Sequence, residues 1–178
     1  ADGAIHTQHP YPTGGAEGTD LNFVYQLKVP IKIKETDAFI KFDEIVLVEP
    51  GESGSVFGSP EFFDYVVVEG SKDGGITWAP LADGYDSRDK NVWLTVYESN
   101  VVDQISTAAG TPGLYRSRTI SLLDEFDVDD IVAFRFRLFS DPFAAGWGWA
   151  IDNLSIQRDT QAPAILHQHT DYLMAGAT

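Results

Sequence analysis

Two acidic residues stand where the surrounding pattern calls for hydrophobic ones. Glu44 lies within the apolar alternation of 40–48, and Asp152 lies within that of 150–156. Alternate residues of a β-strand point to the same face, so both carboxylates should point into the core. An ionised carboxylate buried without a partner is too costly, so each needs a cation, an arginine or strong hydrogen bonds.

Calcium is the cation that the composition favours. The chain has 27 Asp and Glu against 12 Lys and Arg, a formal charge of −15, and Ca²⁺ sites are built from carboxylate and carbonyl oxygens. Glu44 and Asp152 could share one structural Ca²⁺, with Asn153 or backbone carbonyls completing the shell. Alternatively, either acid pairs with an arginine such as Arg116 or Arg118. The acidic charge also argues against nucleic acid as a partner, because binding it needs basic groups on the phosphates.

Other chemistry finds little support. Cysteine is absent, which excludes disulfides, thiolate metal sites and cysteine nucleophiles. There is no Gly-x-Ser-x-Gly elbow, His-Glu-x-x-His helix or phosphate-binding glycine loop. His167 and His169, with Asp171 beyond, could hold a transition metal on a strand, but a polar linker is the favoured interpretation. The chain is therefore not expected to be an enzyme.

Aromatic residues are the candidates for ligand contact. Trp and Tyr rings can stack on sugar rings and other apolar faces. Trp147 and Tyr85 lie in or next to glycine-rich loops, where binding sites of sandwiches usually lie, so both are predicted to bind ligand. Trp93 and Trp149 are expected to be core residues of strands.

Residues 71–78 (SKDGGITW) fit the Ser-x-Asp-x-Gly-x-Thr-Trp pattern of the Asp-box hairpin, known best from sialidases and other β-propellers. Asp73 can bond the backbone beyond it, and Gly74 and Gly75 tolerate positive φ. The pattern occurs once, with no copy at a blade-like spacing. It therefore predicts a turn between two strands, neither a propeller nor a catalytic site.

The elements that must position these residues read as strands separated by glycine- and proline-rich turns. We predict strands, with almost no helical pattern, near 21–33, 38–49, 62–70, 77–82, 91–98, 115–123, 131–139 and 148–157. This pattern favours an all-β fold, an antiparallel two-layer β-sandwich of jelly-roll type. An immunoglobulin-type sandwich is the nearest alternative, though its usual cysteine pair is missing.

The domain organisation follows from where this pattern begins and ends. We expect an irregular lead-in over 1–20, the sandwich over 21–158, and a linker or the start of a following domain over 159–178. No apolar run approaches the ~20 residues of a membrane span. In 131–139, Arg135 and Arg137 share a face and are expected to be solvated or to pair with acids on neighbouring strands.

Two segments, FFDYVVVEGSKDGGITWAPL (62–81) and LFSDPFAAGWGWAIDNLSI (138–156), carry a family resemblance. The chain resembles the jelly-roll accessory modules of secreted and surface proteins of Bacteroidetes-type bacteria. These are akin to cleaved-adhesin and MAM-like domains and are often type IX secretion cargo. The resemblance implies that Asp152 helps to hold a structural Ca²⁺. It identifies no second ligand, so Glu17, Asp20 and Glu44 stay alternatives.

The resulting expectation is a non-catalytic, calcium-stabilised extracellular module for adhesion or glycan binding, secreted or at the cell surface. Its partners would be a glycan or a cell-surface protein, and flanking domains of the same polypeptide. A purely structural spacer or docking domain of a secreted enzyme is the alternative. A glycoside hydrolase is the least favoured, because abundant Asp and Glu make chance carboxylate pairs easy.

Overall fold

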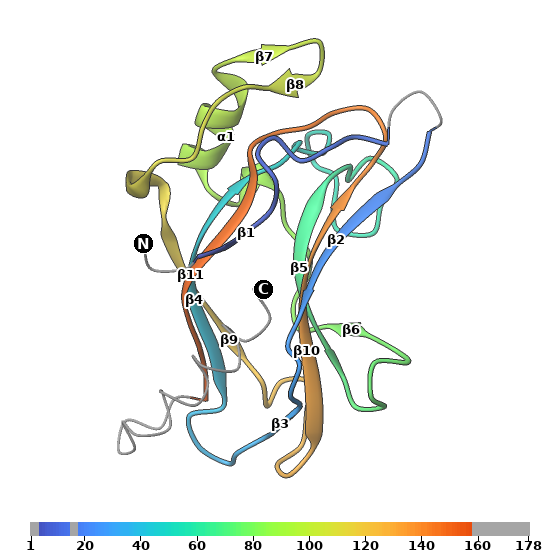
Figure 1. Cartoon of the computed structure of the whole chain (residues 1–178), viewed down its shortest axis with the longest axis vertical. Coiled ribbons are helices and arrows are strands. Elements are labelled where there is room, and N and C mark those ends of the chain that lie inside the picture. Colours follow the sequence, from blue (N-terminus) through green and yellow to red (C-terminus); the bar gives the residue numbers. More distant parts are fainter. Residues whose placement is uncertain (1–3, 15–17, 158–178) are drawn as a thin grey trace.

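The computed structural model describes residues 4–14 and 18–157, which form two antiparallel sheets packed face to face (Figure 1). The four-stranded sheet has the order β1 (Ile5–His6), β11 (Gly148–Ile156), β4 (Phe39–Leu47), β9 (Arg116–Ser121). The five-stranded sheet has the order β2 (Leu21–Gln26), β10 (Ile131–Ser140), β5 (Tyr65–Ser71), β6 (Ala79–Pro80), and β3 (Ile31–Lys32) also pairs with β10. A ribbon of β7 (Val101–Val102) and β8 (Ile105–Ser106) lies beside the helix α1 (Asn91–Glu98) at one end.

The strand order is that of a jelly roll. The chain passes from one sheet to the other six times: between β1 and β2, β3 and β4, β4 and β5, β6 and β9, β9 and β10, and β10 and β11. Long connections of this kind bring strands distant in sequence next to each other, as β11 lies between β1 and β4. The predicted two-layer sandwich is confirmed.

The core lies between the two sheets. Along β10 the alternate residues Val132, Phe134, Phe136 and Leu138 are fully buried. Phe136 meets Phe42 of the opposite sheet edge to face, with ring centroids 5.8 Å apart. Burying each such side chain contributes about 1.5–3 kcal/mol, so the alternation of apolar residues holds the two sheets together.

One predicted strand is wrong. Residues 91–98 form α1, in which Trp93 and Tyr97, four apart, are buried on one face. The β-branched residues of this segment suggested a strand, but the core selects the helical spacing. Trp93 is completely buried and its Nε1 donates to the carbonyl of Leu114 at 2.8 Å, which satisfies the indole inside the core.

The Asp-box turn is confirmed as the connection from β5 to β6. Asp73 accepts hydrogen bonds from the hydroxyls of Ser71 and Thr77 and from the amides of Ile76 and Thr77. Gly74 and Gly75 both have positive φ, at 75° and 94°. These bonds, first that of the Thr77 hydroxyl, hold the pKa of Asp73 far below its usual range.

Part of the expected lead-in belongs to the sandwich. β1 pairs with β11, and Tyr11 is 1% exposed and packs in the core. The short strand escaped the sequence pattern because two residues are too few to show an alternation. Residues 158–178, with the predicted linker, His167 and His169, lie outside the described residues, as does Glu17.

The two arginines of β10 pair with a neighbouring strand, as expected. Arg135 and Arg137 both donate through Nε to Oε2 of Glu69 on β5, at 2.7 and 2.9 Å. Arg135 also lies over the ring of Trp78. Within the described residues, no helix is long and apolar enough to cross a membrane.

Candidate functional site

Three carboxylates meet at one end of the sandwich. Glu49, Asp64 and Asp141 each offer an oxygen, and these oxygens lie within 4.8 Å of one another. Among the described residues no other group of three or more His, Asp or Glu side chains comes this close. We call this group the carboxylate cluster.

The ends of three strands position the cluster. Asp64 immediately precedes β5 and Asp141 immediately follows β10, and these neighbours pair in antiparallel fashion up to Tyr65 and Phe139. The amide of Asp141 donates to Oδ1 of Asp64 at 2.7 Å. Glu49 comes from the opposite sheet, two residues beyond β4. The cluster therefore joins the two sheets.

Burial makes the cluster electrostatically unfavourable without a cation. Asp64 is 0% exposed, and its Oδ2 accepts from the hydroxyl of Tyr11. The pKa of Asp64 is raised to about 8, chiefly by burial and also by the charges of Glu49 and Asp141, which together outweigh the hydrogen bonds that lower it. Burial also raises the pKa of Glu49 to about 7, reinforced by Asp141 and Glu52. A bound divalent cation would return both groups to the ionised form.

The donor set fits Ca²⁺. Oε2 of Glu49 is buried and has no hydrogen-bond partner, although buried polar atoms normally have one. The three side chains offer only hard carboxylate oxygens, and Ca²⁺ takes 6–8 oxygen ligands from carboxylates, carbonyls and water. The residues that could hold the ion are therefore Glu49, Asp64 and Asp141.

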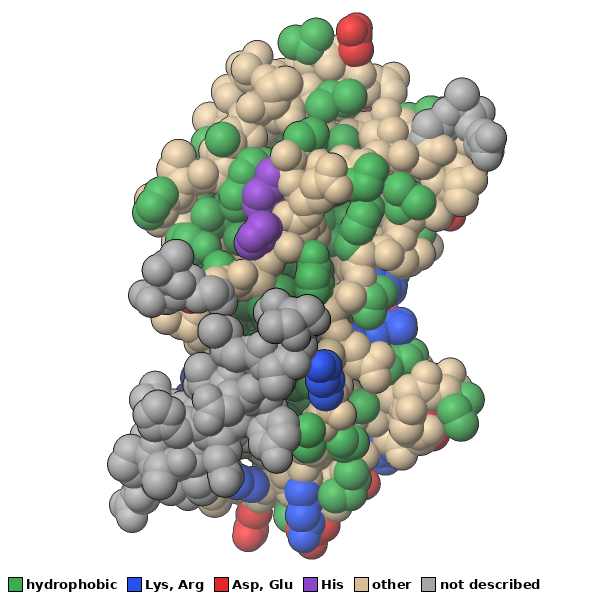
Figure 2. Space-filling view, viewed as in Figure 1, with side chains coloured by type: hydrophobic (Ala, Val, Ile, Leu, Met, Phe, Trp, Pro, Cys, Tyr) green, Lys and Arg blue, Asp and Glu red, His purple; other side chains and the backbone are tan. Residues whose placement is uncertain are grey.

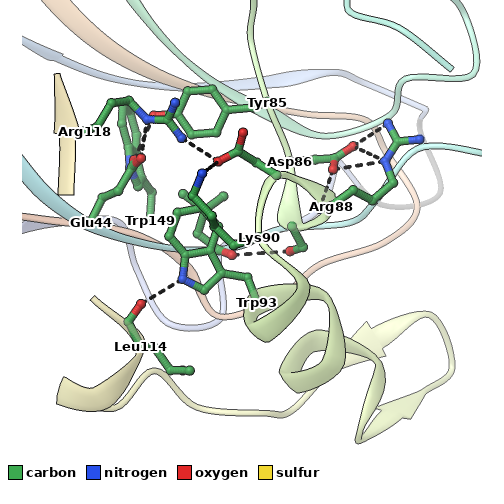
Figure 3. Close-up of polar contacts among 12 residues, drawn as sticks. Glu44, Tyr85, Asp86, Arg88, Lys90, Trp93, Leu114, Arg118 and Trp149 are labelled. Atoms are coloured by element: carbon green, nitrogen blue, oxygen red, sulfur yellow. Dashed lines mark hydrogen bonds and ion pairs between the residues drawn. The ribbon is translucent and has the colours of Figure 1, made fainter. Parts of the chain in front are cut away.

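Glu44, one of the predicted metal ligands, lies in the core as expected but is held by other groups. It is 1% exposed, and one carboxylate oxygen accepts from Nε of Arg118. The other oxygen accepts from the Tyr85 hydroxyl at 2.7 Å and from Trp149 Nε1 at 2.8 Å (Figure 3). The ion pair with Arg118 supplies the opposite charge that the buried carboxylate needs, so the arginine alternative describes Glu44.

The inward orientation predicted for Asp152 is wrong. The pairing of β11 with β4 shifts register between Asp152 and Ser155, and Asn153 has a φ of +53°. The irregularity moves the alternation by one residue, so Ile151 packs in the core while Asp152 is only half-buried. Asn153 is exposed and its amide donates to Asp43 at 2.8 Å.

None of the predicted metal ligands belongs to the carboxylate cluster. Asp20, just before β2, is exposed, and it is not grouped with Glu44, Asp152 or Asn153. The sequence does contain a pattern that could have indicated the carboxylate cluster. Acids directly follow or precede apolar runs in VLVEP, FDYVVV and FRLFSDP, and strand ends on one side of a sandwich meet in space.

The two predicted ligand-binding aromatics are partly covered. The ring of His9 stacks on Trp147 with centroids 3.8 Å apart, and the backbone of Gly110 lies against the other part of that ring. His6 stacks on His9 in turn and both are exposed; Figure 2 shows histidine side chains on the surface. Tyr85 has the Arg118 guanidinium 3.6 Å from its ring centroid. One ring face of Trp147 is therefore covered by His9, and the ring of Tyr85 is covered by Arg118.

Comparison with known proteins leaves the family open. No protein-family model matches the chain, and no match was found among curated proteins. One similar solved structure is a carbohydrate-binding module specific for non-crystalline cellulose, at 15% identity and a TM-score of 0.42. The match covers 86% of this chain and 72% of that one.

Proposed function

We propose that the chain is a non-catalytic, Ca²⁺-stabilised β-sandwich module that serves adhesion or glycan binding within a larger secreted or surface protein. The observation that carries the Ca²⁺ part is the unpartnered, buried Oε2 of Glu49 inside the carboxylate cluster. A cation there would neutralise charge that the fold otherwise buries at a cost. It would also tie the end of β4 in one sheet to β5 and β10 in the other.

A binding role is supported over glycoside hydrolysis by the exposure of the acids. Hydrolysis needs two carboxyl groups that flank a sugar cleft, one of them with a raised pKa. Asp64 and Glu49 both have raised pKa values, but Asp64 is 0% exposed and cannot reach a substrate, and Oε2 of Glu49 is buried inside the cluster. Glu44 is 1% exposed and paired with Arg118. The buried acids thus suit a structural ion better than a reaction.

An extracellular setting agrees with a site of this kind. The Ca²⁺ sites of extracellular modules have Kd values of about 10⁻⁴–10⁻³ M. Such affinities suffice outside the cell, where free Ca²⁺ is abundant. The absence of cysteine is compatible with secretion, because a core of this size needs no disulfide.

Calcium titration tests the proposal. With Ca²⁺ at 100 times its Kd, the native state gains about 2.7 kcal/mol, so Tm at pH 8 should rise by roughly 5–11 °C relative to EDTA. Glu49→Gln should abolish this rise. In EDTA the variant should be at least as stable as the original chain, because it removes a buried charge that has no partner.

Glu125→Gln is the matched control, because Glu125 is an exposed acid outside the cluster. This variant should keep the Ca²⁺-dependent rise. A Tm that EDTA does not change, or a full rise in Glu49→Gln, would remove the Ca²⁺ site from the proposal.

A further inference from the structure

A cleft opens on the side of the sandwich where the edges of the two sheets face each other. β9 is the edge strand of one sheet and β6 that of the other. The cleft between them has a volume of about 180 Å³. Pockets for drug-sized ligands measure about 300–1,000 Å³, so this cleft has room for one small unit.

The lining combines an apolar floor with polar walls. Val68, Leu81 and Ile120 are buried side chains at the base of the cleft. Asp83 and Asp124 line it as exposed carboxylates, and neither forms an ion pair with any residue in the part of the chain that the structure describes. Apolar carbon surfaces beside a few oxygen acceptors match a sugar ring, which has C–H faces and hydroxyl donors.

Arg118 and Tyr85 form a rigid wall of the cleft. Arg118 is fixed by Glu44 through Nε and by Asp89 through Nη2, the latter at 2.7 Å (Figure 3). Its Nη1 has no hydrogen-bond partner among residues 4–14 and 18–157 and remains a donor. The guanidinium lies over the Tyr85 ring, so both side chains are ordered before any ligand arrives, which lowers the entropy cost of binding.

Charge restricts the ligand class. Arg118 is already matched by Glu44 and Asp89, so the unpaired charges in the cleft are those of Asp83 and Asp124. These carboxylates accept strong hydrogen bonds from hydroxyl groups and repel uronic or sialic acids. The net charge of −15 adds to this repulsion.

We propose that this cleft binds one unit of a neutral saccharide, with Asp83 and Asp124 accepting from its hydroxyls and Arg118 donating to its oxygens. The inference rests on the proposed binding role but not on the carboxylate cluster, which lies elsewhere. In this proposal Tyr85 lines the wall of the cleft, and the sugar does not stack on its ring.

Titration of the Ca²⁺-loaded chain with neutral gluco-, manno-, galacto- and xylo-tetraoses tests the proposal, with tetragalacturonate as the anionic comparison. NMR amide shifts should change at 81–85 and 118–124 with at least one neutral sugar. Replacing both carboxylates (Asp83→Asn with Asp124→Asn) should weaken that sugar about tenfold, because two charge-assisted hydrogen bonds become neutral ones. Tetragalacturonate should bind at least about tenfold more weakly.

Asp103→Asn, in the turn of the β7–β8 ribbon, is the matched control and should bind like the original chain. Unchanged melting temperatures would show that the cleft variants fold. The proposal is overturned by three results: no binding of any neutral tetraose at millimolar concentration, shifts confined to the Trp147 region, or equal binding of tetragalacturonate. A chain that Ca²⁺ stabilises but that binds no saccharide refutes this inference and leaves the Ca²⁺ site intact.

Discussion

At the scale of single residues, two acids with the same sequence pattern have opposite environments. Burial raises the pKa of Glu44, and the ion pair with Arg118 and the hydrogen bonds from Tyr85 and Trp149 oppose that effect. Asp152 is half-buried, and its Oδ1 accepts from the amide of Asn153 at 2.7 Å. Their contributions to stability should therefore differ sharply.

Neutralising each acid measures this difference. Glu44→Gln should lower the free energy of unfolding by about 3 kcal/mol, the low end for a broken buried pair, because Arg118 keeps Asp89. Asp152→Asn should change it by less than about 0.5 kcal/mol and should leave the Ca²⁺-dependent Tm rise intact. Urea denaturation of both variants in Ca²⁺ provides the values. Similar losses in the two variants would contradict the assigned environments.

At the scale of elements, α1 shows tertiary packing overriding local preference. Its sequence, NVWLTVYE, is rich in β-branched residues and alternates well enough for a strand. The preceding 3₁₀ turn at 87–89 is capped by Asp86, whose side chain accepts from the amide of Arg88. This turn leads into the helix, and the buried face of Trp93 and Tyr97 then stabilises it.

Whether residues 91–98 form a helix or a strand can be tested by the direction in which one substitution changes the free energy of unfolding. Thr95 is exposed in α1, so Thr95→Ala should raise the free energy of unfolding by about 0.5 kcal/mol, because alanine has the higher helix propensity. On a strand the same change would lower it, because threonine is favoured there. Chemical denaturation distinguishes the two signs. A loss of stability would argue for the strand that the sequence suggested.

At the scale of the whole molecule, the jelly roll brings the ends of β4, β5 and β10 to one place and thereby creates the carboxylate cluster. The same topology leaves β6 and β9 as facing edges and creates the cleft. The two sites are thus consequences of strand order rather than of any local motif.

The cluster should make stability depend on pH. The pKa values of Glu49 and Asp64 are raised, to about 7 and about 8, so between pH 4 and 8 the Ca²⁺-free folded state binds more protons than the unfolded state. Raising the pH therefore destabilises the Ca²⁺-free chain. The Tm difference between Ca²⁺ and EDTA should grow from pH 5 to pH 8. Calorimetry in buffers of different ionisation enthalpy should detect roughly one proton released per Ca²⁺ at pH 7. A pH-independent difference would contradict the assigned ionisation.

Features that depend on residues close together in the sequence could be predicted, and features that depend on packing between distant residues could not. The alternation in 131–139 and the turn chemistry of Asp73 are local, and both were predicted correctly. The bulge at Asn153 and the helix at Trp93 depend on what packs against them. Alternation alone therefore predicted an inward-pointing Asp152 and a strand over 91–98, and both predictions were wrong. The two residues of β1 show no pattern of their own and become a strand only by pairing with β11.

The two-layer β-sandwich, the Asp-box turn and the burial of Glu44 could be predicted from the sequence, because each depends on residue type and short-range periodicity. Which acids come together could be seen only in the folded chain. Glu49, Asp64 and Asp141 lie 15 or more residues apart and meet because three strands end at the same edge of the fold. Likewise, the partner of Glu44 is Arg118, 74 residues away, because β9 pairs with β4 and places the guanidinium on the same inner face.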